Sequence, residues 1–214
     1  TYGDGRQEVV VTDPAMWQYY DDGPVVYGSF FQGEVYDATK EKALEGWSTS
    51  SYDASGWKPC LEVDVKGTTY EGNGDYSQTK ITAQFGQTVK KVKELTAVSV
   101  QQVRPGVYVY DMGQNMVGIP EIRLDGMRPG MRVTMRFAEV KYPELPEYKG
   151  NEGMIMFENI RSAVAQDIYL TKGGVELIRP RFTFHGYRFV EITGIEKPLA
   201  LEDVKGIVLS SVHE

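Results

Sequence analysis

Several residue types and patterns are scarce in this chain of 214 residues. Its only cysteine, Cys60, excludes an internal disulfide and a CxxC zinc site. It has two histidines, His185 and His213, so few side chains can act as bases near neutral pH. No apolar run approaches the roughly 18 residues that a membrane-spanning helix needs. We therefore expect a globular protein without a membrane partner.

Positive charge is scarce in the first third of the chain. Residues 1–65 carry twelve acidic side chains against four basic ones, whereas residues 66–214 are nearly balanced, and the whole chain has a net charge of −7. A nucleic-acid surface needs a basic patch, so we expect no nucleic-acid partner. An acidic region permits a site for a hard cation, although a solvated acidic surface is the commoner outcome.

Alternating apolar and polar residues recur along the chain and predict strands with one face in the core. In Arg132–Phe137, we expect Val133, Met135 and Phe137 to share one face. The same period places Ile122 and Leu124 opposite Glu121, Arg123 and Asp125, and Ile168 and Leu170 opposite Asp167, Tyr169 and Thr171. Short glycine-containing turns separate these segments, so the pattern predicts an all-β fold, an antiparallel β-sandwich.

Helical periodicity is nearly absent. Thr39–Glu45 and Glu158–Gln166 predict only a turn or two of helix each, and Tyr142–Gly153 reads as a surface loop. Further strands are expected at Glu8–Thr12, Val25–Phe31 and Glu34–Asp37. The polar, glycine-rich segment 66–79 is the best candidate for a linker, which divides the chain into two β units, residues 1–65 and 80–214.

Aromatic residues gather in the first third, which holds all three tryptophans, Trp17, Trp47 and Trp57. Flat aromatic rings suit the apolar face of a sugar, and Trp47 and Trp57 are therefore candidate substrate-binding residues. The plainer interpretation, that each tryptophan anchors a loop on the core, is favoured for any one of them.

Paired carboxylates would be needed for glycoside hydrolysis. Glu34 and Asp37 are close in sequence, but strand alternation sends them to opposite faces. Asp21 and Asp22 are adjacent and typical of a solvated turn. We therefore predict no catalytic residue within this chain, and name Glu34 and Asp37 only as candidates for sugar binding.

Two polar groups are candidates for an interface with another domain. Asp111, Gln114 and Asn115 lie in DMGQNMVG, where Gly113 and Gly118 permit a bulge or a tight turn. These side chains either satisfy a local irregularity or form a polar seam. The second group comes from Arg179–Gly194, where alternation places Thr183, His185, Tyr187 and Glu191 on one strand face and Phe182, Phe184, Val190 and Ile192 on the other.

No metal site is predicted from the sequence. The segment EGNGD (71–75) has the composition of a calcium loop but lacks its spacing and its terminal glutamate.

Four segments together resemble the concanavalin-like β-sandwich of bacterial α-L-rhamnosidases, which are inverting glycoside hydrolases of family 78. They are VYVYDMGQNMVG (107–118), PGMRVTMRFAEV (129–140), ENIRSAVAQDIYL (158–170) and PRFTFHGYRFVEITG (180–194). Upstream, GPVVYGSFFQGEVYDA (23–38) and YDASGW (52–57) resemble the end of the preceding jelly-roll domain. The resemblance covers nearly the whole chain and is weakest over about residues 62–95.

The resemblance implies a jelly-roll end in residues 1–65 and a concanavalin-like sandwich in residues 80–214. It also implies that the family's catalytic acids lie in a helical barrel beyond Glu214, and that the early jelly-roll strands, with most sugar and calcium contacts, precede Thr1. The implied partners are that catalytic helical domain and L-rhamnose-containing glycans. No cofactor is expected in this chain, although calcium is possible in the rhamnose-binding module. The compartment stays open, with a periplasmic or secreted location favoured over a cytoplasmic one.

Three functions remain open at this point. The chain is an accessory, non-catalytic part of an α-L-rhamnosidase that cleaves terminal rhamnosides with inversion, with Thr183, His185, Tyr187 and the Asp111–Asn115 seam as its docking surface. Alternatively, it is a carbohydrate-binding module, with or without calcium, that uses Trp47 and Trp57. A third alternative is a purely structural or adhesive sandwich.

Overall fold

A computed structural model describes residues 1–62, 67–69, 72–74, 80 and 82–212. The chain divides into two compact units, and each unit is made of two separate segments. The smaller unit comprises Thr1–Asp22 and Gly46–Gly86, and the sandwich unit comprises Gly23–Glu45 and Gln87–Glu214. This division differs from the boundaries expected from the sequence, because residues 23–45 join the sandwich unit.

The smaller unit has little regular structure. β1 (Gln18–Tyr19) pairs antiparallel with β4 (Lys58–Pro59), and β5 (Gly67–Thr69) pairs with β6 (Gly72–Gly74). The strand predicted at Glu8–Thr12 is wrong, since those residues have no regular secondary structure and are exposed. Apart from β5 and β6, the predicted linker 66–79 lies outside the described residues.

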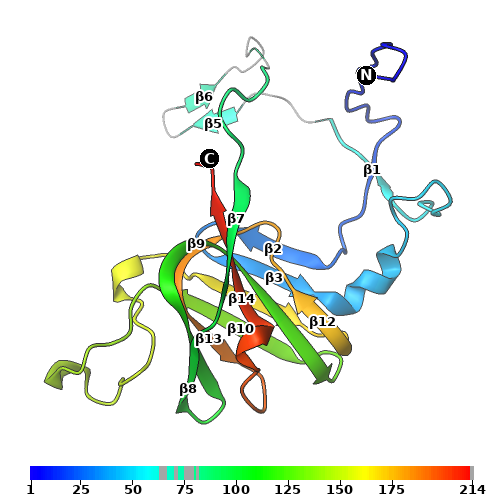
Figure 1. Cartoon of the computed structure of the whole chain (residues 1–214). Coiled ribbons are helices and arrows are strands. Elements are labelled where there is room, and N and C mark those ends of the chain that lie inside the picture. The colour runs from blue at the N-terminus through cyan, green and yellow to red at the C-terminus, as the bar shows by residue number, and fades with distance from the viewer. Residues whose placement is uncertain (63–66, 70–71, 75–79, 81, 213–214) are drawn as a thin grey trace. The chain divides into compact units, whose positions relative to one another are not determined.

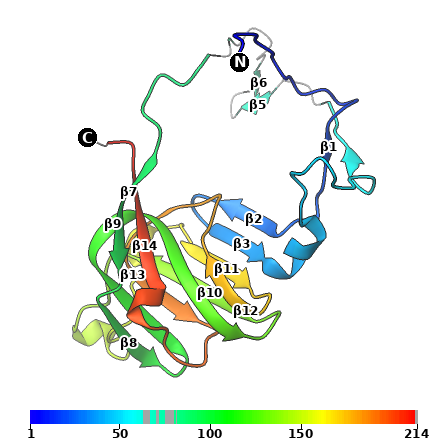
Figure 2. The ribbon, with the colours of Figure 1, turned by 45° about the vertical axis from the view of Figure 1, so that its right-hand side comes forward.

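Ten strands of the sandwich unit form one continuous sheet that curls on itself (Figures 1 and 2). The strand order is β2-β3-β11-β10-β13-β9-β14-β7, and β8 and β12 also pair with β9. The strands are β2 (Val25–Ser29), β3 (Gly33–Asp37), β7 (Lys90–Thr96), β8 (Ser99–Arg104), β9 (Val107–Met127), β10 (Arg132–Ala138), β11 (Gln166–Leu170), β12 (Gly174–Ile178), β13 (His185–Thr193) and β14 (Val204–Ser210).

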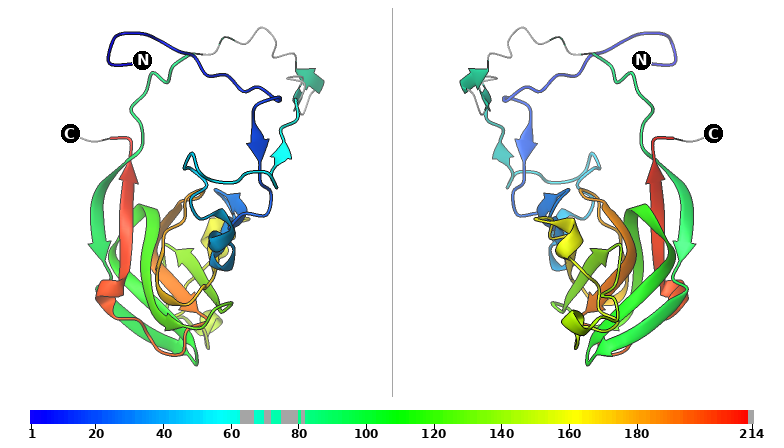
Figure 3. Two further views of the ribbon diagram at one scale, coloured as in Figure 1. Left: turned by 90° about the vertical axis from the view of Figure 1, so that its right-hand side faces the viewer. Right: turned by 90° about the vertical axis from the view of Figure 1, so that its left-hand side faces the viewer.

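The 21-residue strand β9 connects the two layers of the sandwich. Its first half pairs with β8 and β13, and its second half pairs with β12 and β14. Figure 3 shows β14, in red, lying between β9 and β7. Tyr110 from the first half and Leu124 from the second half belong to one buried cluster, so the two halves face each other across a common core.

Gly118 marks the point where β9 passes from one layer to the other. It pairs with His185 of β13 and with Val208 of β14. A Cβ atom here would lie 2.1 Å from the carbonyl oxygen of Ile207, so only glycine lets β14 approach this closely.

The predicted bulge in DMGQNMVG is confirmed. Asp111 pairs with Phe189 and Met116 with Tyr187, so four residues of β9 lie opposite the single residue Arg188. Gly113 adopts a φ of +78°, which glycine reaches without steric penalty.

The all-β class is confirmed, and two of the three alternation patterns are correct. Val133, Met135 and Phe137 are fully buried, as are Ile122 and Leu124. All strand pairs of this sheet are antiparallel except β3 with β11, which is parallel.

β11 presents its polar face inward. Asp167, Tyr169 and Thr171 are buried, whereas Ile168 and Leu170 are half-buried. Hydrogen bonds make burial of this face possible; for example, the Thr171 hydroxyl donates to the carbonyl of Arg128 at 2.6 Å.

Among the residues that the structure describes, helical structure is limited to short 3₁₀ turns. These are η1 (Ala38–Leu44), η2 (Pro146–Tyr148), η3 (Glu158–Ile160) and η4 (Leu201–Asp203). η1 replaces the α-helical turns expected at Thr39–Glu45, and Asp37 caps it by accepting from the Thr39 amide at 3.0 Å. Within the described part of the chain, no helix has the length and apolarity required to cross a membrane.

Candidate functional site

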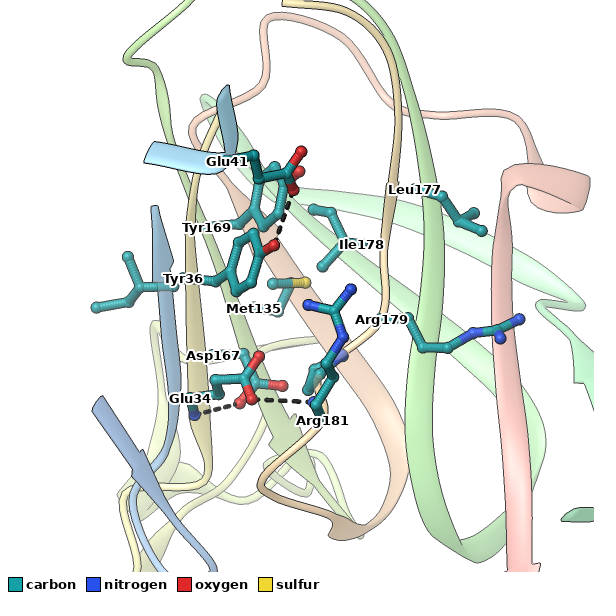
Figure 4. A pocket seen from close by; sticks show the side chains of 12 residues that line it. Glu34, Tyr36, Glu41, Met135, Asp167, Tyr169, Leu177, Ile178, Arg179 and Arg181 are labelled. Atoms are coloured by element: carbon teal, nitrogen blue, oxygen red, sulfur yellow. Dashed lines mark hydrogen bonds between the residues drawn. The ribbon is translucent and has the colours of Figure 1, made fainter. Parts of the chain in front are cut away.

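A pocket of about 270 Å³ opens in the sandwich unit where the inner faces of β3, β10 and β11 extend past β12 (Figure 4). β12 is an edge strand, since it pairs only with β9. The pocket is lined by Glu34, Tyr36, Glu41, Met135, Asp167, Ile168, Tyr169, Leu177, Ile178, Arg179, Pro180 and Arg181.

Two buried carboxylates form the floor of this pocket. Glu34 accepts hydrogen bonds from the backbone amides of Arg181 and Phe182, both at 2.9 Å. Asp167 Oδ1 accepts from the Glu34 amide at 2.9 Å and lies 3.0 Å from Nε2 of His185. Together they tie the β2–β3 hairpin to the segment that precedes β13. The second oxygen, Asp167 Oδ2, is buried and has no hydrogen-bonding partner among the described residues.

Two tyrosines form the wall of the pocket. The rings of Tyr36 and Tyr169 stack at 5.5 Å with an angle of 3° between their planes. Burial raises the pKa of both phenols, so both stay neutral and can donate. Tyr36 donates to Glu41 at 2.8 Å, and Tyr169 donates to Glu176 at 3.1 Å.

Charged groups at the mouth of the pocket have different partners. Burial favours the protonated form of Glu41, but hydrogen bonds from Lys172 and Tyr36 outweigh it and lower the pKa of Glu41. Lys172 also forms an ion pair with Glu41. The Arg181 guanidinium lies 5.3 Å from the centroid of the Tyr36 ring and forms no ion pair within the part of the chain that the structure describes.

The polar seam of β9 lies on the outer surface of the sandwich unit. Asp111 accepts two hydrogen bonds from the Arg188 guanidinium, both at 2.9 Å, and these lower the pKa of Asp111. Gln114 and Asn115 are exposed; Gln114 accepts from Lys93 at 3.1 Å, and Asn115 donates to Glu139 at 3.1 Å. The seam is therefore ordered by neighbours on β13 and β7 and by Glu139, which follows β10, and it remains accessible.

A second concave surface lies in the smaller unit, where all three tryptophans meet. We call it the tryptophan groove; it is lined by Met16, Trp17, Gln18, Trp47, Thr49, Tyr52, Ala54 and Trp57. Trp47 is 61% exposed and Trp17 is 45% exposed. Trp57 packs against Tyr20 and Tyr52 with ring centroids 5.9 and 5.8 Å apart.

Comparison with protein families assigns both parts of the chain. Residues 101–210 match the bacterial alpha-L-rhamnosidase concanavalin-like domain, and residues 1–93 match the alpha-L-rhamnosidase N-terminal domain. The chain belongs to the bacterial α-L-rhamnosidase family. This result confirms the resemblance seen in the sequence.

Individual relatives agree with this assignment. An alpha-L-rhamnosidase of Streptomyces avermitilis is 39% identical over 97% of this chain, and one of Alteromonas sp. is 35% identical over all of it. The chain spans only 18% and 20% of those relatives, which is about a fifth of their length.

Solved structures extend the comparison to the fold. The S. avermitilis alpha-L-rhamnosidase, solved in complex with L-rhamnose, matches 97% of this chain with a TM-score of 0.79 and 38% identity, over 18% of its own length. The enzyme of Dictyoglumus thermophilum matches 97% of this chain with the same TM-score and 31% identity, over 21% of its length.

Three of the residues that were predicted to form a docking surface are buried in the structure. Thr183, His185 and Tyr187 are at most 5% exposed. His185 stacks on Phe137 with ring centroids 4.1 Å apart, and Thr183 donates to the carbonyl of Ser29 at 3.0 Å. These three side chains lie in the interior of this rhamnosidase sandwich, where Asp167 is the partner of His185. The Tyr187 hydroxyl has no hydrogen-bonding partner among the described residues. Of the residues expected on the opposite face, Phe182 is 60% exposed and Phe184 is 43% exposed, whereas Val190 and Ile192 are buried in the core.

The four residues predicted to bind sugar do not form one site. Trp47 and Trp57 share the tryptophan groove, whereas Glu34 is buried beneath the pocket and Asp37 caps η1. Both acids bind backbone amides of the chain itself. Within the described residues, no group of three or more histidine, cysteine, aspartate or glutamate side chains could hold a metal ion.

The sequence analysis missed Asp167, Tyr169 and Arg181 as pocket residues. A signal was present in QDIYLT, where the polar half of the alternation includes an aspartate, a tyrosine and a threonine. It was read as a solvent-facing side, because alternation alone does not tell which face of a strand is covered.

Proposed function

We propose that this chain is a non-catalytic accessory part of an α-L-rhamnosidase whose catalytic helical domain hydrolyses terminal α-L-rhamnosides with inversion. The observation that carries the proposal is that both buried carboxylates of the pocket already form hydrogen bonds with other groups of the chain. Inverting hydrolysis needs one carboxyl group that donates a proton and another that activates water, with roughly 6.5–9.5 Å between them. Glu34 is instead held by two backbone amides, and Asp167 by a third amide and His185.

In this proposal the sandwich unit supports and orients the catalytic domain through the Asp111–Asn115 seam. The Arg188–Asp111 pair fixes the bulged backbone at two points, and Gly113 donates its amide to Asp111 at 2.7 Å. Gln114 and Asn115 are then presented in a set orientation, which lowers the entropy lost when a partner binds.

The purified chain should release no nitrophenol from an aryl α-L-rhamnoside, because the acids of its pocket are hydrogen-bonded within the fold. The measurement is a spectrophotometric assay, with the full-length S. avermitilis relative as the positive control. Turnover by the chain that disappears in Glu41→Gln or Glu34→Gln would contradict the non-catalytic role.

A second candidate function, a carbohydrate-binding module, is favoured by the tryptophan groove. Trp17, Trp47 and Trp57 converge there, although they lie up to 40 positions apart in the sequence. Exposed indole rings in a concave surface suit the apolar face of a pyranose, and nearby hydroxyl and amide groups can bind its hydroxyls.

If the groove binds sugar, L-rhamnose should give saturable heat in calorimetric titration, and Trp47→Ala should weaken the binding about tenfold, a loss of ~1.4 kcal/mol. Phe85→Ala is the matched control, since Phe85 is a fully exposed aromatic residue of the same unit outside the groove. Titration with and without chelator shows whether calcium takes part. Equal heats in the two variants would exclude this function for the groove.

A further inference from the structure

The pocket of Figure 4 combines a carboxylate oxygen that has no donor among the described residues with a guanidinium that forms no ion pair with them. Asp167 is 2% exposed and its Oδ2 atom accepts no hydrogen bond from the described residues, although a buried carboxylate oxygen almost always has a donor. Its partner oxygen, Oδ1, already holds the Glu34 amide and His185. The carboxylates of Glu34 and Asp167 face the segment that carries Arg181.

Arg181 supplies the donors. Its backbone is fixed by the hydrogen bond from its amide to Glu34, so the start of its side chain is held at the pocket rim. The guanidinium lies against Tyr36, and a hydrogen bond with that side chain raises the pKa of Arg181. It carries five N–H groups and forms no ion pair with the described residues, so donors remain for a ligand.

Two charged side chains of the pocket already have ion-pair partners, since Glu41 pairs with Lys172 and Arg179 pairs with Glu121. The groups left for a ligand are one carboxylate oxygen and one guanidinium. A complementary ligand must donate to Asp167 and accept from Arg181, and hydroxyl groups do both.

The remaining walls fit the carbon skeleton of such a ligand. Met135 and Ile178 present apolar surface, and the cavity of about 270 Å³ suits one small ring rather than a chain. We infer that the pocket between β3, β11 and β12 is a binding site for a small, neutral, polyhydroxylated molecule of monosaccharide size. This site is separate from the tryptophan groove. The experiment below measures binding directly, so its result does not depend on the proposed accessory role.

The test is a titration of the whole ¹⁵N-labelled chain with L-rhamnose, D-glucose, myo-inositol and glycerol in turn, followed by NMR. The amides of Glu34, Arg181 and Phe182 donate to the two floor carboxylates and should shift saturably, with a Kd of about 1 mM for at least one ring compound. Glycerol is the smaller probe, which fills less of the cavity and should bind more weakly.

Arg181→Ala should weaken this binding at least about fivefold while leaving the fold intact, because its guanidinium is exposed and packs only at the rim. Arg179→Ala is the matched control, since Arg179 points away from the pocket and pairs with Glu121. Absence of saturable shifts at the three amides with every probe overturns the proposal. So does binding that Arg181→Ala leaves unchanged, or that Trp47→Ala removes.

Discussion

Replacement of Glu34 by alanine should lower the free energy of unfolding of the sandwich unit by about 3 kcal/mol. The Glu34 carboxylate accepts from the amides of Arg181 and Phe182, and it is 3% exposed, so alanine leaves two amides without their acceptor. Because Glu34 lies on β3, the loss also loosens the β2–β3 hairpin. Urea unfolding followed by far-ultraviolet circular dichroism measures the change; tryptophan fluorescence does not, since all three tryptophans are in the smaller unit.

Two variants separate this effect from a general loss of a glutamate. Glu34→Gln keeps an acceptor oxygen at the same reach and should lose about half as much stability or less. Glu41→Ala removes a neighbouring glutamate whose side chain is 32% exposed and ion-paired, so its effect should stay below about 1 kcal/mol. Equal unfolding midpoints for Glu34→Ala and the unsubstituted chain would show that the hydrogen bonds to Glu34 do not hold the hairpin.

Gly118→Ala should destabilise the sandwich unit by about 3 kcal/mol or more. Its Cβ atom would lie 2.1 Å from the Ile207 carbonyl oxygen and 2.9 Å from the Ile207 carbonyl carbon, and both of these are backbone atoms that cannot rotate away. Relief requires β14 to move from β9, which breaks the pairing that joins the two layers. Hydrogen exchange should then show loss of protection in β14 and β7 first.

Gly186→Ala is the matched control for this prediction. Gly186 lies on β13 and pairs with Val117, next to Gly118, but its Cβ atom would meet only the Glu139 side chain at 3.8 Å. We expect a change of no more than about 0.5 kcal/mol. If both alanine variants unfold alike, the close approach of β14 is not what requires glycine at position 118.

The β2–β3 hairpin, which Glu34 holds in place, belongs to the sandwich unit, although the family models place it in the N-terminal domain. The family models divide the chain between residues 93 and 101, with the hairpin on the N-terminal side. In the structure, β3 pairs parallel with β11, so residues 23–45 complete the sandwich sheet. A fragment that begins at residue 80 would lack these strands and expose Tyr169 and Asp167, which Tyr36 and the Glu34 amide otherwise cover.

Local patterns predicted much of the sandwich. Alternation in Arg132–Phe137 and around Ile122 and Leu124 identified inward side chains correctly, because apolar residues on one side of a strand can be buried only together. The glycines of DMGQNMVG predicted the bulge, since a φ of +78° at Gly113 is open to glycine. The multi-segment resemblance identified the family, which the comparisons confirm.

The pocket could not be predicted in the same way. Whether the face of β11 that carries Asp167 and Tyr169 is wet or buried depends on β3, whose paired residues are 133 positions away in sequence and run parallel to it. A strand pattern carries no information on which distant residues supply hydrogen-bonding partners. The bulge opposite Arg188 also shifts the alternation along β13, so Tyr187 and Val190 both face the core.

The sequence by itself determined the all-β class, the inward residues of two strands, the bulge in β9 and the family, because each of these follows from residues that are close together or from a matched pattern. Only the tertiary structure decided that residues 23–45 belong to the sandwich, that His185 is interior, and that the three tryptophans share one groove. These features depend on which segments lie side by side. Pairing between distant strands and buried hydrogen bonds decide which segments become neighbours, and neither can be recognised in a local stretch of sequence.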